Sequence, residues 1–170
     1  MALLPFQLSL RPTLMSDTRL TPEKNGLRYG LYTTAGMIVY FLVASLFGLT
    51  ERIEFSFLNG FIMAIGVTLA IRHFKYAKDD HMAYLQGYGT GIITGAVAGV
   101  AFGLFFIIYA TINPALMDQI TARDLFGFDL SVVIAFLAIV LQSVMGASVV
   151  ALIAMQYYKS PDHKPIEEVE

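Results

Sequence analysis

The chain has 170 residues, of which 56% are hydrophobic and only 14% are charged, and its mean hydropathy is +0.65. A typical soluble domain is about 45–50% apolar and about 25% charged, and a soluble chain of this size cannot bury such an excess of apolar surface. The net charge of −2 provides no basic field for nucleic acid. The absence of cysteine excludes disulfides, cysteine-based zinc sites and thiol nucleophiles. The composition therefore predicts an integral membrane protein whose first partner is the lipid bilayer.

Four charge-poor segments are long enough to cross a bilayer. A hydrocarbon core of about 30 Å requires about 20 apolar helical residues, and a helix satisfies its own backbone groups in lipid. The spans are expected at about residues 29–49, 55–71, 86–112 and 130–157. The predicted fold class is all-α. It is an integral membrane four-helix bundle over residues 27–158, with an N-terminal arm at 1–26 and a tail at 159–170.

The first helix is expected to begin ahead of its span, at Thr21-Pro22-Glu23. Threonine can cap the helix, proline suits the first helical position, and glutamate complements the positive helix end. Upstream, residues 1–10 are uncharged and mostly apolar, without the basic region or cleavage site of a secretory signal. Two interpretations stay open. Either this arm is disordered, with Met15 as the natural start, or it lies on the membrane or on a partner protein.

The loops give further helix boundaries. The second helix should continue from Arg72 to Lys78, because no glycine or proline interrupts it. The Asn113-Pro114 pair should end the third helix, because the residue before proline avoids the helical region. Residues 114–126 would form either a short helix in the outer membrane interface or an irregular loop.

Lysine and arginine predict the orientation. Nine of the 11 lie in the N-terminal segment, the loop after the second helix and the tail, and only Arg52 and Arg123 lie in the other two loops. Cytoplasmic segments carry the excess of Lys and Arg. Both termini are therefore predicted to be cytoplasmic.

The most specific pattern is in the third helix, where glycine recurs every four residues. Glycine destabilises a helix interior by about 1 kcal/mol relative to alanine, so five in register indicate a packing role. In lipid, small residues at this spacing let two helix backbones approach closely. The fourth helix carries a weaker matching stripe, and the packing would be within the chain or, in part, against another subunit. The predicted helix-packing residues are Gly87, Gly91, Gly95, Gly99, Gly103, Ser143, Ala147 and Ala151.

No charged residue lies at mid-membrane depth in the predicted spans, which argues against a proton relay, a voltage sensor or an ion-coupled transporter built on one chain. The intramembrane polar residues are Asn59, Gln142, Thr90 and Thr94. Each amide would either bond to a neighbouring helix or line a polar pathway. The histidines fit no metal-ligand spacing, and no catalytic or phosphate-binding motif is present. We therefore expect no enzymatic activity, no cofactor and no metal.

Three short motifs support a resemblance to a known family. They are Leu27-Arg-Tyr-Gly-Leu31 entering the first helix, Ile71-Arg-His-Phe-Lys75 leaving the second, and Tyr84-Leu-Gln-Gly87 opening the third. Over about residues 24–160 the chain resembles a family of small bacterial four-helix membrane proteins known only as a domain of unknown function. The resemblance implies this fold and an inner-membrane location, and it implies no activity.

Two function hypotheses follow. The first is a non-catalytic accessory or scaffold subunit that packs against other membrane subunits, or against itself, through its helix surfaces. It is based on the glycine stripe, the apolar arm and the lack of charged residues in the spans. The second is a small oligomeric carrier or channel with a polar lining from Asn59, Gln142, Thr90 and Thr94.

Overall fold

The computed structural model describes residues 20–48, 53–78, 82–113 and 132–158. Within these ranges the chain forms four helices and no strand: α1 (Pro22–Leu46), α2 (Ile53–Ala77), α3 (Tyr84–Ile112) and α5 (Val132–Tyr158). Each contains a stretch long and apolar enough to cross a membrane. Over the described residues, the predicted all-α architecture of four helices apolar enough to span a membrane is therefore confirmed. Residues 114–126, for which a short interfacial helix and an irregular loop are both open, lie outside the described residues, as do residues 1–19 of the arm and the tail.

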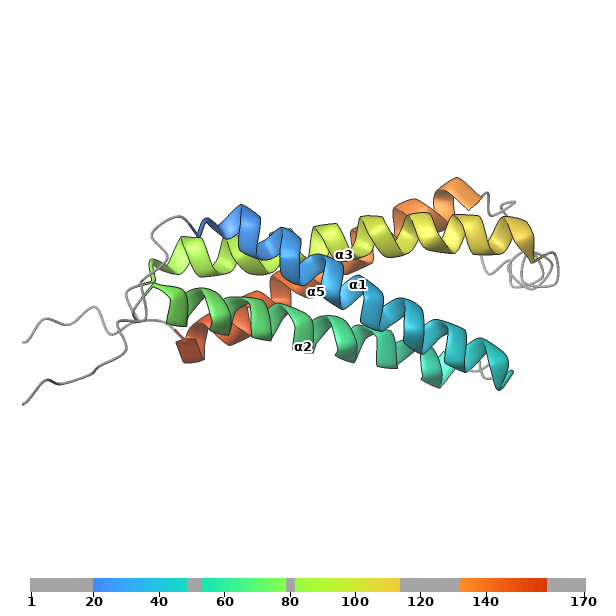
Figure 1. The fold of residues 1–170 in the computed structure, drawn as a ribbon, viewed down its shortest axis with the longest axis horizontal. Coiled ribbons are helices and arrows are strands. Elements are labelled where there is room, and N and C mark those ends of the chain that lie inside the picture. The colour runs from blue at the N-terminus through green and yellow to red at the C-terminus, as the bar shows by residue number, and fades with distance from the viewer. Residues whose placement is uncertain (1–19, 49–52, 79–81, 114–131, 159–170) are drawn as a thin grey trace, which may run out of the picture.

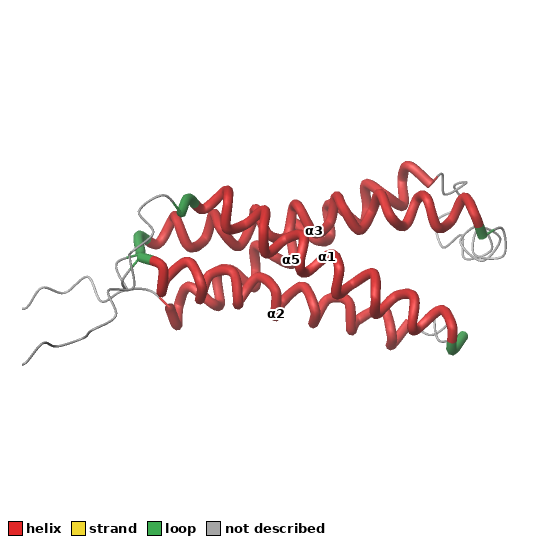
Figure 2. The backbone as a smooth tube through the Cα atoms, in the orientation of Figure 1, coloured by secondary structure: helices red, strands yellow, loops and turns green. Residues whose placement is uncertain are grey.

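The helices alternate in direction along the bundle. α1 and α3 begin at the end where α2 and α5 finish (Figure 1). We call this the termini end, because the described chain starts and stops there, and we call the opposite end the far end. Figure 2 traces the same path as a tube in which all four helices follow the long axis. Every pair of described helices is in contact except α1 and α5, so α2 and α3 separate these two.

The helix boundaries follow from local chemistry. Thr21 is in an extended conformation and its hydroxyl oxygen accepts a hydrogen bond from the backbone N–H of Lys24 at 3.3 Å, while Pro22 occupies the first turn. α3 ends at Ile112, just before the Asn-Pro pair. Beyond α1, Gly48 has a φ of +65°, which glycine adopts without a steric penalty. The helix start predicted at Thr21 and the end predicted for α3 are both confirmed.

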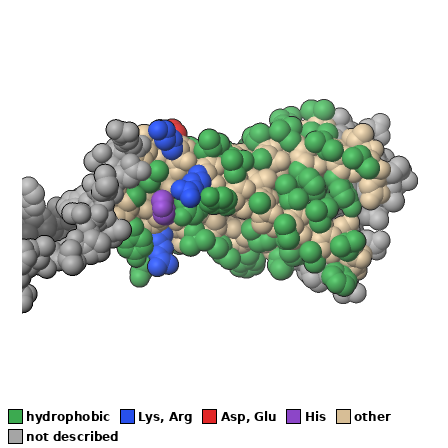
Figure 3. All heavy atoms as spheres, viewed as in Figure 1, with side chains coloured by type: hydrophobic (Ala, Val, Ile, Leu, Met, Phe, Trp, Pro, Cys, Tyr) green, Lys and Arg blue, Asp and Glu red, His purple; other side chains and the backbone are tan. Residues whose placement is uncertain are grey.

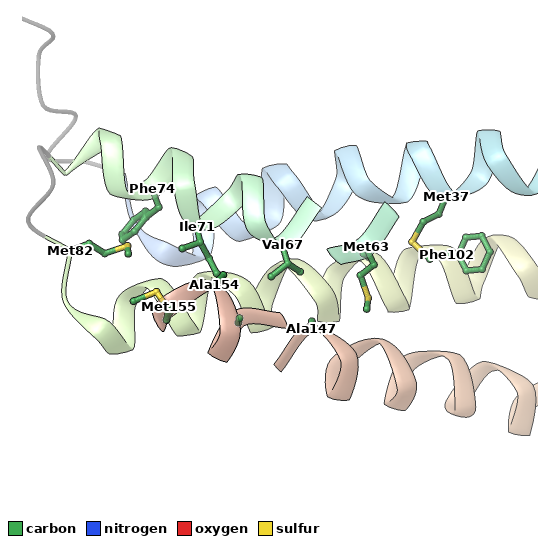
Figure 4. Packing of buried hydrophobic residues seen from close by; sticks show 12 residues of the cluster. Met37, Met63, Val67, Ile71, Phe74, Met82, Phe102, Ala147, Ala154 and Met155 are labelled. Atoms are coloured by element: carbon green, nitrogen blue, oxygen red, sulfur yellow. The ribbon is translucent and has the colours of Figure 1, made fainter. Parts of the chain in front are cut away.

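The core runs along the inside of the bundle. Phe74, Ile71, Val67 and Met155 are fully buried. Figure 4 shows the row of buried side chains continuing from Met82 near the termini end toward the middle of the bundle. Lipid is as apolar as these side chains, so the bundle is held by close packing and interhelical hydrogen bonds, with little help from a hydrophobic driving force.

Basic side chains gather at the termini end (Figure 3). The guanidinium groups of Arg28 and Arg72 lie 5.7 and 5.6 Å from the ring centroids of Tyr32 and Tyr76. Arginine and tyrosine are typical of the membrane–water interface, where the ring is half-buried and the charge stays in water. This belt therefore fixes the depth at which the bundle lies in a membrane.

Two pairs of hydroxyl groups connect α3 to its neighbours. Tyr88 Oη lies 2.6 Å from Ser148 Oγ of α5, and near the far end Tyr109 Oη lies 2.7 Å from Ser45 Oγ of α1. In the same region the ring of Phe41 packs edge-on against four rings of α3, those of Phe102, Phe105, Phe106 and Tyr109. Hydrogen bonds between hydroxyls and edge-to-face ring contacts are directional. They therefore restrict how α1 and α5 can rotate against α3.

A buried amide joins α1 to α2 near the termini end. Asn25 is fully buried, its Nδ2 donates to the backbone oxygen of Ala70 at 2.8 Å, and its Oδ1 lies 2.9 Å from Nδ1 of His73. Because an amide oxygen only accepts, His73 Nδ1 carries the proton in this pair. The ring of His73 also lies 5.3 Å from that of Tyr29. Asn25 therefore fixes the register between α1 and α2.

Replacing Asn25 with leucine, which has a similar shape, should destabilise the protein by about 1 kcal/mol. The substitution removes both hydrogen bonds, while the half-buried His73 can still find water. Thermal unfolding of the purified protein in detergent measures the loss. In the double variant Asn25→Leu with His73→Phe, the loss should be smaller than the sum of the single losses; strictly additive effects would show that the two side chains do not act together.

Candidate functional site: an intramembrane polar cavity

The glycine stripe of α3 faces α5 along its whole length. A Cβ placed on each glycine would meet α5 in antiparallel order: Gly87 meets Met155, Gly91 meets Ala151, Gly95 meets Ala147, Gly99 meets Ser143 and Gly103 meets Phe136. Along most of the stripe, four residues forward in α3 correspond to four residues back in α5. The structure therefore brings the two predicted stripes of small residues together in one interface within the chain.

This interface has no room for a side chain on α3. A Cβ on Gly95 would overlap the Cβ of Ala147 and lie 3.1 Å from the backbone oxygen of Ser143. A Cβ on Gly99 would lie 3.4 Å from the Cα of Val140. By contrast, Gly89, on another face of α3, has nothing within 4 Å of its Cβ position. The close approach of α3 to α5 is therefore not shared by the face of α3 that carries Gly89.

A second glycine contact holds α1 against α3. Cβ atoms on Gly26 and Gly30 would lie 3.2 and 3.0 Å from the backbone oxygens of Thr90 and Thr94. Gly26 and Gly30 are four residues apart, the same signal as in α3. Neither Gly26 nor Gly30 is among the predicted helix-packing residues. α3 thus packs closely on two sides, against α5 through its own glycines and against α1 through those of α1.

The two intramembrane threonines belong to this packing. Thr90 and Thr94 are fully buried, and their hydroxyls donate to the backbone oxygens of Gln86 and Thr90 at 2.8 Å. Such bonds to the preceding helical turn satisfy a hydroxyl without a partner helix. The structure therefore places these threonines apart from Asn59 and Gln142, with their donor capacity already used.

The other two predicted polar residues meet at one cavity. A cavity of about 120 Å³ is lined by Met37, Asn59, Gly60, Met63, Phe102, Ile139, Gln142 and Ser143. Asn59 is six residues from the start of α2 and Gln142 is ten from the start of α5, which places them about 9 and 15 Å from the far end. The cavity thus lies inside the apolar layer. Sequence reasoning assigned Ser143 only to packing and missed its place here.

The polar groups of the cavity are not satisfied by the described residues. The Oδ1 atom of Asn59 is buried and has no hydrogen-bond partner among them. The side chain of Gln142 is exposed and, within the described ranges, makes no hydrogen bond. A buried acceptor without a partner costs about 1–3 kcal/mol. The cavity therefore offers free amide groups to a molecule outside the chain.

The chemistry of the lining limits what the cavity can do. Its polar side chains are two amides and one hydroxyl, and none of the eight lining residues is ionisable near neutral pH. General acid–base catalysis needs a group that exchanges protons in that range. The site can donate and accept hydrogen bonds, and its lining contains no group suited to transfer a proton.

Comparison with known proteins identifies the family of this chain. A family model described as a protein of unknown function (DUF4199) matches residues 28–125, more than half of the chain. This match bears out the resemblance inferred from the sequence motifs. No curated protein and no solved structure matches. The matched segment includes Asn59 and the glycine stripe and ends before α5 begins.

Proposed function

We propose that this chain, which belongs to the DUF4199 family of proteins of unknown function, is a non-catalytic accessory or scaffold subunit of a larger membrane assembly. The observation that carries the proposal is the cavity at which the exposed amide of Gln142 on α5 meets the buried, unpartnered Oδ1 of Asn59 on α2. A buried polar group without a hydrogen-bond partner costs about 1–3 kcal/mol. A neighbouring helix that brings a polar group removes this penalty. The α2–α5 face therefore suits a transmembrane helix of another subunit.

The proposed location is a bacterial inner membrane with both termini in the cytoplasm. The basic side chains at the termini end support this orientation, because Lys and Arg are retained on the cytoplasmic side. The described spans carry no charged side chain near the cavity, which fits a subunit that binds other helices and does not conduct ions.

Isolation from native membranes in mild detergent tests the proposal. We expect a particle well above the 18.7 kDa of one chain, containing a fixed set of different membrane subunits. The chain alone, or a symmetric ring of identical chains with a water-filled centre, would contradict the accessory role.

The substitution Asn59→Leu should have opposite effects on stability and on assembly. It removes a buried acceptor without a partner, so the isolated chain should gain about 1 kcal/mol of stability. It also removes the group offered to the partner, so co-purification of other subunits should fall. Thermal unfolding and quantitative co-purification measure the two effects. The matched control is Asn113→Leu, outside the cavity at the end of α3, which should leave assembly unchanged. Unchanged co-purification with Asn59→Leu would count against the site.

A second candidate function is a small oligomeric carrier or channel, which the polar lining of the cavity favours. Its lining would come from Asn59, Gln142 and Ser143, because the hydroxyls of Thr90 and Thr94 are bonded within α3. The chain has no cysteine, so a Gln142→Cys variant can be probed in intact vesicles with a membrane-impermeant thiol reagent. Rapid labelling would favour this function over the accessory role.

A further inference from the structure

One strip of α5 faces outward over most of the helix. Its residues follow a spacing of four and three and are all exposed: Ala138, Gln142, Met145, Val149, Leu152 and Gln156. The opposite face of α5 carries the buried Ser143, Ala147 and Ala151, which pack on the glycines of α3. α5 also buries the smallest share of its apolar span among the four described helices. α5 is therefore the least buried of the four described helices, and the strip lies on its outward side.

Of the two glutamines in this strip, Gln142 lies deep in the membrane. Gln142 is ten residues after Val132 and sixteen before Tyr158, or about 15 and 24 Å from the two helix ends. Its amide is exposed there and makes no hydrogen bond within the described ranges. The buried, unpartnered Oδ1 of Asn59 lies at the same cavity. An exposed, unpartnered amide at this depth on the outward face of α5 indicates that a hydrogen-bonding surface covers it.

We infer that the α5 strip binds the α5 strip of a second copy of this chain. This inference rests on the proposed function, in which the α2–α5 face binds a helix of another subunit. It adds that this subunit is a second copy of the same chain. The belt of arginine and tyrosine, including Arg28 and Arg72, holds every copy at the same depth and in the same orientation. A second copy therefore brings an amide to the same level.

The symmetry of such a pair makes the strip complementary to itself. Two copies with the same orientation are related by a two-fold axis along the membrane normal, so their α5 helices run parallel and each residue meets its own equivalent. A primary amide both donates and accepts, so two Gln142 side chains can bond reciprocally. The spacing of four and three is that of parallel helices packed with a left-handed crossing. α5 contains no charged residue, so identical helices do not repel each other.

Single-cysteine variants test this contact, because the chain has no other cysteine. Met145→Cys places a thiol in the strip, and Val39→Cys is its matched control on α1. Both native side chains are 61% exposed, and α1 does not touch α5 among the described helices. In liposomes at a low protein-to-lipid ratio with a mild oxidant, most of the Met145→Cys protein should become a disulfide-linked dimer. Val39→Cys should stay near background.

The role of the amide is tested in the Met145→Cys background. Adding Gln142→Leu should lower the linked fraction several-fold, whereas Gln142→Asn should preserve part of it. Gln142 is exposed, so neither change should prevent folding, which an unchanged melting temperature verifies. Equal linking of Met145→Cys and Val39→Cys, or no effect of Gln142→Leu, would overturn the inference.

The same variants separate the inference from the proposed function. If Met145→Cys in native membranes forms a disulfide only with a different protein, the inferred pairing of two copies is wrong and the accessory role stands. If Met145→Cys links to nothing and no other subunit co-purifies, both fail. If it links to its own copy within a particle that also contains other subunits, both stand.

Discussion

Gly95→Leu should destabilise the bundle by about 3 kcal/mol, at the upper end of the range for overpacking. A first side-chain carbon would already overlap the Cβ of Ala147 and lie 3.1 Å from the backbone oxygen of Ser143. A leucine therefore forces the backbones of α3 and α5 apart and loosens the neighbouring pairs along the stripe. Thermal unfolding in detergent should show the melting temperature falling by several degrees or more.

The control for this variant is Gly89→Leu. It makes the same change on the same helix, at a position with nothing within 4 Å of the new Cβ. Leucine is the better helix former by nearly 1 kcal/mol, so Gly89→Leu should be neutral or slightly stabilising. If both variants lose the same stability, the loss comes from the helix itself, and the stripe is not a close contact.

A compensating change locates the contact more sharply. In Gly95→Ala the nearest obstacle is the methyl group of Ala147, so adding Ala147→Gly moves one methyl from α5 to α3 and should restore part of the stability. The backbone oxygen of Ser143 stays in place, which limits the rescue. A double-mutant cycle measures the coupling, and additive losses would place the two residues apart.

The close packing of α3 could be predicted from the sequence, whereas the cavity could not. The four-residue spacing of Gly91, Gly95 and Gly99 is a property of one helix, so it can be read without knowing any neighbour. That Asn59 and Gln142 meet at one cavity depends on how α2 and α5 are rotated about their axes. Contacts such as that of Met63 with Gly146 set those rotations. The residue spacing within one helix does not predict contacts with another helix.

The burial of Asn25 at the termini end could likewise not be predicted from the sequence of one helix. Its neighbours in the sequence are charged or small, which is typical of a segment outside the membrane, and the sequence analysis placed it in the N-terminal arm. Its burial depends on α2 continuing past the apolar layer, so that Ala70 and His73 lie beside it. Each helix extension was predictable by itself. That the two extensions bury one amide between them is a property of the assembled pair.

Gly30→Ala should destabilise the bundle by about 2 kcal/mol through the other face of α3. The new Cβ would lie 3.0 Å from the backbone oxygen of Thr94 and 2.7 Å from the Cβ of Val97. The carbonyl cannot move away without distorting α3 itself. The matched control is Gly36→Ala, also in α1, where the nearest atom, in the side chain of Ile62, is 3.4 Å away. Unfolding of the two variants in detergent should differ by several degrees in melting temperature.

Gly30→Ala should loosen the packing of α1 without changing the packing of α5 on α3. α1 contacts α2 and α3 but not α5, so loosening α1 leaves the interface between α3 and α5 intact. Disulfide linking through Met145→Cys should therefore survive Gly30→Ala, whereas Gly95→Leu, which displaces α5, should reduce it. If both glycine variants reduced linking equally, the two faces of α3 would be coupled, and α5 could not be treated as an independent docking surface.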